Sequence, residues 1–251
     1  MSKIISVHSF RGGTGKSNTT ANLATLLAAE GLRVGVIDTD ISSPGIHVLF
    51  GLDEEDIKAS LNDYLWGQCE IEQAAQEVTS RVGAPIQGRL FLVPSSMKPG
   101  DIARILRESY DVGLLNDGYQ RLLEELALDV LMIDTHPGLN EETLLSIAIS
   151  DALVIIMRPD SQDYQGTAVT VEVARKLGVP RLLLVVNKVP SSFKPAEVKA
   201  RVEKTYNCEV AGVLPHSDEM MTLASSGIFV LRYPNHPVTA MLKQIAASVM
   251  V

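Results

Sequence analysis

The sequence predicts an α/β fold with a mostly parallel β-sheet and helices on both of its faces. Seven short runs are apolar at consecutive positions, which is typical of parallel strands buried on both sides. Between these runs lie longer segments in which apolar residues recur every three or four positions, as on one face of a helix. Strands that alternate with helices in this way form βαβ units and a parallel sheet.

The predicted elements follow one another in a regular order. The strands span residues 3–9, 32–40, 88–96, 127–138, 151–160, 179–190 and 208–215. The helices span residues 17–30, 101–108, 114–128, 141–150, 164–177 and 195–206, and a glycine follows the first and the fifth as a helix stop. The chain has 251 residues and no internal repeat or linker-like tract, so we expect one domain over residues 1–251.

Composition and charge exclude several classes of protein. The two cysteines, Cys69 and Cys208, are far apart in the sequence, so they indicate neither a disulfide framework nor a cysteine metal site. No apolar run approaches the roughly 20 residues of a membrane span, and the N-terminus lacks a signal-peptide pattern, so we expect a cytoplasmic protein. The net charge of −8 opposes a globally basic nucleic-acid binder but allows a local basic patch.

A glycine-rich turn, FRGGTGKSNTT at residues 10–20, joins the first predicted strand to the first helix. It ends like the phosphate-binding pattern G-x-x-x-x-G-K-[ST], although Phe10 occupies the position of the first glycine. Glycines allow the backbone to turn its N–H groups toward phosphate oxygens, here at Gly12, Gly13 and Gly15. Lys16 would reach the β- and γ-phosphates, and the Ser17 hydroxyl would hold Mg²⁺. An ordinary turn with an incidental lysine is the less favoured interpretation.

Polar residues close most of the predicted strands. In parallel sheets ligands gather where the carboxyl ends of the strands meet, so these residues are candidates for a site. They are residues 11–17, Asp38, Asp40, Asp134, residues 158–160, Asn187, Lys188 and residues 215–218. The simpler alternative is that each residue only caps the next element, which is common for Asp and Asn.

Five ordered motifs resemble the MinD/ParA family of deviant Walker A ATPases. They are GGTGKS (12–17), VIDTD (36–40), LMIDTHPGL (131–139), VVNKV (185–189) and GVLPHSDE (212–219), and together they extend over nearly the whole chain. The resemblance implies a P-loop NTPase fold, the hydrolysis of ATP to ADP and phosphate, and ATP and Mg²⁺ as cofactors. Such ATPases form a homodimer when ATP is bound.

The resemblance also implies a role for each residue at the phosphates. Lys16 matches the phosphate-binding lysine, and Ser17 matches the Mg²⁺-binding hydroxyl. The loop around the phosphates then comprises Gly12, Gly13, Thr14, Gly15, Lys16, Ser17 and Asn18, with Asn18 beside the α-phosphate in place of the usual threonine.

Further roles follow for the aspartates and for the adenine side. Asp38 and Asp40 match the Walker A′ aspartates. Asp38 is expected to assist both catalysis and metal binding, and Asp40 to orient the attacking water. Asp134 matches the Walker B aspartate that binds Mg²⁺ through water. The adenine base would contact Asn187, Pro215 and His216, although an exposed loop histidine often has no such role.

Arg11 occupies the position of a family lysine that crosses the dimer interface and contacts the phosphates of the other subunit. A cation there would neutralise charge that develops on the transferred phosphoryl group. Arginine keeps the charge but differs from lysine in shape, so Arg158, Lys188 or another cation could make the contact instead, leaving Arg11 in a local ion pair. The sequence shows no obvious carboxylate partner for Arg11, which favours the role across the interface.

Three surfaces could couple the ATPase to a target. A basic amphipathic C-terminal helix would bind a membrane, but the apolar stripe of residues 237–251 carries one cation, so we expect it to pack on the domain. Non-specific DNA could bind a basic segment that also contains interleaved glutamates. The alternative is that this segment is only a solvated helix of mixed charge. Its cations are Lys188, Lys194, Lys199, Arg201 and Lys204. An adaptor protein linked to a cargo would trigger hydrolysis.

We therefore expect a nucleoid-associated positioning or partition ATPase, whose cargo is a carboxysome, a plasmid or a chromosome. The arginine at position 11 favours the McdA group, which spaces carboxysomes. The alternatives are a metabolic ligase or maturation ATPase on the same fold, and a MinD-like membrane-associated regulator of cell division. A cluster-carrying reductase is disfavoured because the required cysteines are lacking.

Overall fold

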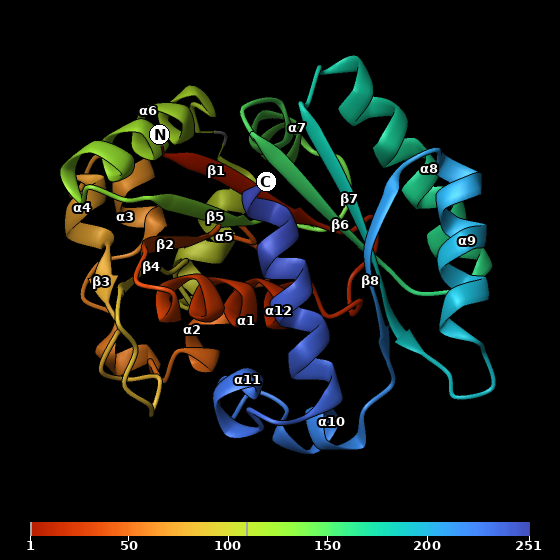
Figure 1. Cartoon of the computed structure of the whole chain (residues 1–251). Helices are drawn as coiled ribbons and strands as arrows, with labels where there is room; N and C mark the ends of the chain where they lie inside the picture. Colours follow the sequence, from red (N-terminus) through yellow and green to blue (C-terminus); the bar gives the residue numbers. More distant parts are fainter. Residues whose placement is uncertain (1, 109) are drawn as a thin grey trace.

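The computed structural model describes residues 2–108 and 110–251, which form an eight-stranded sheet with helices on both faces (Figure 1). The strand order is β3-β4-β2-β5-β1-β6-β7-β8, and every neighbouring pair is parallel except β3 and β4. The strands are β1 (Lys3–His8), β2 (Arg33–Asp38), β3 (Gln76–Glu77), β4 (Arg89–Val93), β5 (Val130–Asp134), β6 (Ala152–Met157), β7 (Arg181–Val189) and β8 (Glu209–Pro215).

The α/β fold class predicted from the sequence is confirmed, and all seven predicted strands are present. The prediction missed β3, a two-residue strand that pairs antiparallel with β4 at the edge of the sheet. Two residues are too few to show an apolar alternation, so only the neighbouring strand reveals that this segment is extended.

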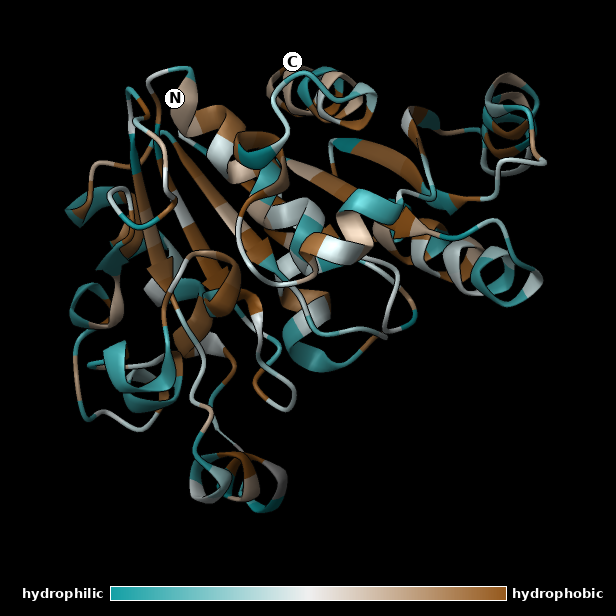
Figure 2. Ribbon diagram, turned by 90° about the horizontal axis from the view of Figure 1, so that it is seen from below, coloured by the Kyte–Doolittle hydropathy of each residue, from teal (hydrophilic) through white to brown (hydrophobic). Residues whose placement is uncertain are grey.

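Alternate residues of the buried strands face opposite layers of helices. In β5, for example, Val130 and Met132 belong to one core cluster and Leu131 and Ile133 to another. Figure 2 shows the apolar strands enclosed between the helices. One layer contains α1 (Lys16–Ala29), α2 (Ile46–Leu49), α11 (Phe229–Arg232) and α12 (Pro237–Met250). The other contains α3 (Leu61–Leu65), α4 (Ile71–Ala74), α6 (Gly113–Glu125), α7 (Glu141–Ala148), α8 (Ser161–Lys176) and α9 (Pro195–Tyr206).

The six predicted helices are present with small differences at their ends, as α1, α5 (Pro99–Arg107), α6, α7, α8 and α9. Helix α8 begins three residues earlier than predicted, because the Asp160 side chain accepts hydrogen bonds from the N–H groups of Gln162 and Asp163 and caps the helix there. The prediction missed α2, η1 (Glu54–Asp56), α3, α4, α10 (Asp218–Leu223) and α11, which are each six residues or shorter.

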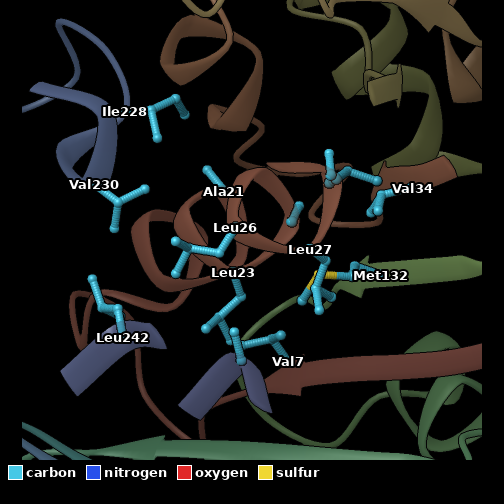
Figure 3. Packing of buried hydrophobic residues seen from close by; sticks show 14 of the residues in the cluster. Val7, Ala21, Leu23, Leu26, Leu27, Val34, Met132, Ile228, Val230 and Leu242 are labelled. Atoms are coloured by element: carbon cyan, nitrogen blue, oxygen red, sulfur yellow. The ribbon is translucent and has the colours of Figure 1, made fainter. Parts of the chain in front are cut away.

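Helix α1 is buried on most of its surface between the sheet and the C-terminal helices. Figure 3 shows Leu23 and Leu27 directed toward Val7 and Met132 of the sheet, with Leu242 of α12 on the other side. The apolar stripe of α12 is buried at Val238, Leu242, Ile245 and Val249, so its predicted packing on the domain is confirmed. Within the described residues, no helix combines the length and the apolar character that crossing a membrane requires.

Candidate nucleotide-binding site

The turn between β1 and α1 depends on two glycines with left-handed backbone. Gly13 has φ 75° and Gly15 has φ 94°, and residues with a Cβ rarely adopt such angles. Gly15 is the N-cap of α1, so the free N–H groups of the first helical turn face the loop. The Thr14 hydroxyl is buried in the loop and has no hydrogen-bond partner within residues 2–108 and 110–251. These features make the turn a cradle for an anion.

Lys16 lies over two buried carboxyl groups at the ends of β2 and β5. These strands are neighbours with Asp38 paired to Asp134, so both side chains reach the same edge of the sheet. Lys16 Nζ lies 3.1 Å from Asp134 Oδ1, which also accepts a 2.9 Å hydrogen bond from the Thr20 hydroxyl. The structure thus brings Asp134 to Lys16 and Thr20, which lie more than 100 positions before it in the sequence.

Asp38 is fully buried, and its backbone contacts only partly compensate for the lost water. Its carboxyl oxygens accept hydrogen bonds from the N–H groups of Asp40 (3.0 Å) and Gly45 (3.2 Å). Burial, and then the negative charge of Asp134, raise the pKa of Asp38 to about 7, while the charge of Lys16 opposes that shift. A cation placed beside Asp38 would therefore favour its ionised form.

Asp40 meets a histidine that the sequence analysis did not single out. His136 Nδ1 lies 2.6 Å from Asp40 Oδ1 and 3.3 Å from the Ser42 hydroxyl. The sequence contains a signal for this pair, because IDTD at residues 37–40 and IDTH at residues 133–136 each lie at the end of a strand. In the sheet Asp38 is paired with Asp134, so the two motifs lie side by side.

A second histidine outside the predictions, His8, ends β1 beneath the loop. It is fully buried, and its Nδ1 lies 2.8 Å from the Thr135 hydroxyl. Burial, followed by the charge of Lys16, lowers the pKa of His8 to about 3, so the ring is neutral in the folded protein. A buried neutral histidine makes folding dependent on pH.

Replacing His8 by asparagine should remove part of the acid sensitivity of the nucleotide-free protein. The unfolded chain binds a proton at His8 below about pH 6.5 and the folded chain does not, so stability falls as the pH drops from 6.5 toward 3. Between pH 6.5 and 5 the wild type should lose about 2 kcal/mol more than His8→Asn. Urea unfolding at both pH values measures this difference. Protonation of Asp38 stabilises the folded protein as the pH drops, but Asp38 is present in both proteins and its effect cancels. If stability depended on pH equally in the two proteins, His8 would not be the group responsible.

The residues predicted for the adenine side also come together. Asn187 is buried at the end of β7 and donates a 2.8 Å hydrogen bond from Nδ2 to the Thr14 carbonyl. A cavity of about 180 Å³ opens beside it, lined mostly by apolar atoms. Its lining includes Gly15, Asn18, Asn187, Pro215, His216 and Met220. A flat aromatic base fits this mixture of apolar surface and one amide.

Ser17 and Asn18 lie half-buried in the first turn of α1. Asn18 Oδ1 accepts a 2.9 Å hydrogen bond from Asn22 Nδ2, and Asn18 also lines the cavity beside Asn187. Among the described residues, no group of three or more His, Cys, Asp or Glu side chains is arranged to hold a metal alone. A Mg²⁺ ion bound together with a nucleotide needs fewer side-chain ligands, because phosphate oxygens and water complete its coordination.

Arg11 has carboxylate partners that the sequence did not reveal. Its guanidinium lies 3.4 Å from Asp163 Oδ1 and 3.7 Å from Asp160 Oδ1, on the first turn of α8 and at its N-cap. Arg158 binds the same Asp163 at 3.1 Å. Burial alone would raise the pKa of Asp163, but the hydrogen bonds from Arg158 and the charge of Arg11 outweigh it and lower that pKa. The local ion pair that the sequence left open for Arg11 is therefore present, and the side chain of Arg11 is still 40% exposed.

The basic segment of β7 and α9 is a face of mixed charge. Lys194 pairs with Glu197 at 2.8 Å, and Lys199 lies 3.8 Å from Glu203. The Arg201 guanidinium lies over the Tyr164 ring, and Lys188 Nζ donates to the Gly13 carbonyl. Exposed pairs of this kind stabilise a protein weakly, so these cations can exchange partners with little loss.

The glycine turn, the lysine over two carboxyl groups and the parallel sheet define a P-loop nucleotide-binding protein. The chain belongs to the ParA family, described as NUBPL iron-transfer P-loop NTPases, whose family model matches residues 1–250. It is thus a P-loop NTPase of the MinD/ParA/NUBPL class, which implies ATP binding and ATP hydrolysis.

Several relatives match the chain over nearly its full length, among them the following two. An uncharacterised ATP-binding protein of Methanocaldococcus jannaschii is 28% identical over 98% of this chain and 87% of that protein. The iron–sulfur cluster carrier protein of Pseudomonas fragi is 29% identical over 98% of this chain and 84% of that protein.

Solved structures of similar fold share less sequence. The septum site-determining protein MinD of Pyrococcus horikoshii, complexed with Mg-ADP, has a TM-score of 0.81 and 21% identity over 99% of this chain and 96% of its own. The MinC:MinD cell division complex of Aquifex aeolicus has a TM-score of 0.80 and 19% identity over 99% and 96%. Apo McdA of Cyanthece has a TM-score of 0.77 and 17% identity over 100% of both chains. At these identities the likeness concerns the fold.

Proposed function

We propose that residues 1–251 act as one ATPase domain that dimerises when ATP binds, attaches as a dimer to a matrix, and is released by partner-stimulated hydrolysis. The single observation that carries this proposal is the position of Lys16, which is buried over Asp38 and Asp134 at the mouth of a glycine cradle. A triphosphate with Mg²⁺ matches this arrangement, because the lysine would bind phosphate while the metal takes its place beside the carboxylates.

Each group of the site has a part in binding ATP. The loop N–H groups and Lys16 bind phosphate oxygens, and the Thr14 hydroxyl, which has no partner in the described part of the chain, offers one more donor. Ser17, Asp38 and Asp134 would hold Mg²⁺, which neutralises charge on the β- and γ-phosphates. Asn187, Pro215 and His216 enclose the base in the cavity beside Gly15.

Hydrolysis requires a group that orients water, and a cation at the reacting phosphoryl group. We assign the first role to Asp40, which lies only two residues beyond the buried Asp38. We assign the second to Arg11 of the opposing subunit. Its exposed guanidinium would leave Asp160 and Asp163 on dimerisation, and Arg158 would remain to neutralise Asp163.

Nucleoid DNA is the matrix that we propose, through the exposed cations of α9 and the preceding loop. Phosphates of DNA would replace glutamates as partners of Lys194 and Lys199, so binding should weaken steeply with salt. A protein named McdA has the same fold, so we include the carboxysome among the candidate cargoes. The other candidates are a plasmid and a chromosome. An adaptor protein would link the cargo to the dimer and stimulate hydrolysis.

Iron transfer, suggested by the family description and by the cluster carrier, is the second candidate function. The residues of this chain do not fit a cluster, which needs several cysteine thiolates close together. Cys69 and Cys208 are its two cysteines, they belong to different apolar clusters, and burial raises the pKa of both thiols. A ligase remains an alternative, and so does a MinD-like membrane cycle, although the buried stripe of α12 disfavours the latter.

The mass of Asp40→Ala in solution with ATP and Mg²⁺ tests the proposal. We expect a stable dimer with ATP and a monomer with ADP, because the variant binds ATP but cannot hydrolyse it. DNA added at rising salt should bind only the dimer, with an affinity that falls steeply with salt. A persistent monomer would contradict the switch, whereas a dimer indifferent to DNA would contradict only the choice of matrix.

A further inference from the structure

The pairing of β2 with β5 brings Asp40 and His136 together. Asp38 and Asp134 are directly opposed at the ends of these parallel strands, and Asp40 and His136 each follow two residues later. The chains therefore leave the sheet side by side, and the two side chains meet with His136 Nδ1 2.6 Å from Asp40 Oδ1.

The chemistry of the two groups defines the direction of this hydrogen bond. A carboxylate oxygen accepts hydrogen bonds, so we assign the proton of this bond to His136 Nδ1, which then donates to Asp40 Oδ1. A bond of this length to a carboxylate is charge-assisted and stronger than one between neutral groups. It therefore restricts the rotation of the Asp40 side chain.

Hydrogen bonds fix the backbone segments that carry Asp40 and His136. The Thr39 N–H donates to the Asp134 carbonyl at 2.9 Å, and the Thr135 N–H donates to the Val7 carbonyl at 3.2 Å. The Thr143 hydroxyl on α7 donates to the His136 carbonyl at 3.3 Å. The imidazole thus projects from a tethered segment, which suits a group that orients another side chain.

We propose that His136 is a positioning residue for hydrolysis: its Nδ1–H holds Asp40 Oδ1 so that the second oxygen, Oδ2, is directed to the attacking water. This inference rests on the proposed function, because it requires Asp40 to orient that water. The side chains of Asp40 and His136 are 14% and 30% exposed, so both are largely shielded from solvent and still accessible to a small reactant.

Two substitutions at position 136 separate positioning from a general structural role. His136→Ala removes the donor and should lower kcat about 10- to 100-fold while KM for ATP changes less than about threefold. His136→Asn places an amide N–H near the site of Nδ1, so it should restore kcat to within about fivefold of wild type. His236→Asn, at the N-cap of α12 and outside the site, is the matched control and should leave kcat unchanged.

A double-mutant cycle with Asp40→Asn completes the test. If His136 acts through Asp40, then Asp40→Asn with His136→Ala should be no slower than Asp40→Asn alone. Thermal melting and ATP binding of each variant establish that the protein is folded. A folded His136→Ala with wild-type kcat, additive effects in the cycle, or no recovery in His136→Asn would each overturn the inference. Full activity of Asp40→Asn would instead overturn the proposed role of Asp40.

Discussion

Replacing Lys16 by glutamine is expected to lower the ATPase rate constant by about 10²- to 10³-fold. The lysine is the only cation within 4 Å of the buried Asp134 among the described residues, and it is the group that we expect to stabilise charge on the transferred phosphoryl group. Steady-state phosphate release at saturating ATP measures the effect.

The same substitution should also weaken the nucleotide-free protein. Removing one partner of a buried ion pair leaves the other charge uncompensated, which costs about 3 kcal/mol or more. The charge of Lys16 opposes the raised pKa of Asp38, so without it that pKa rises further. A carboxyl group with a raised folded pKa loses stability as the pH rises, so the destabilisation should be larger at pH 8 than at pH 6.

Lys176→Gln is the control for both measurements. Lys176 is an exposed residue of α8 that pairs with Glu172, so its loss should change stability by less than about 0.5 kcal/mol and leave the rate intact. Were Lys16→Gln as stable and as active as Lys176→Gln, neither the buried pair nor the phosphate role of Lys16 could be correct.

Replacing Gly15 by alanine is expected to destabilise the protein by about 2 to 4 kcal/mol and to weaken ATP binding at least about 10-fold. A left-handed φ costs a non-glycine residue about 1 to 2 kcal/mol. The new Cβ would also lie 2.5 Å from Asn187 Nδ2, so Asn187 would have to move and lose its hydrogen bond to Thr14. Urea unfolding and titration with a fluorescent ATP analogue measure the two effects.

Gly31→Ala separates strain from crowding. Gly31 has the same φ of 94°, but a Cβ there would meet no atom within 4 Å. It should therefore show the strain alone, about 1 to 2 kcal/mol, with unchanged ATP binding. Equal destabilisation in the two variants would contradict the close approach of Asn187. Unchanged ATP binding in Gly15→Ala would contradict the assignment of the loop to phosphate.

The sequence could predict the strands and longer helices because their signals are local. A strand buried on both faces is apolar at consecutive positions, as in VLMI before Asp134, and a helix such as α9 repeats its apolar residues at Val198 and Val202. The short helices between residues 46 and 74 carry no such period. Two of them, α3 and α4, contribute Leu61 and Ile71 to a core cluster with residues of α6 and the sheet, which are distant in sequence.

The candidate site was predictable in its members but not in its contacts. Strand ends indicated Asp38, Asp40 and Asp134, and the structure brings them to one edge of the sheet. The partners of Arg11 and the role of His8 depend on which strand lies beside which. Strand β6 lies next to β1, so the residues that follow it bring Asp163 to Arg11.

By itself the sequence determined the α/β class, the phosphate loop and the set of polar strand ends, because each depends on neighbours within a few residues along the chain. Only the tertiary structure decided that Lys16 stands over Asp134, that His136 holds Asp40 and that Arg11 rests on α8. The physical reason is that strand order and register bring together groups more than 90 positions apart, and a local pattern of residues carries no information about that pairing.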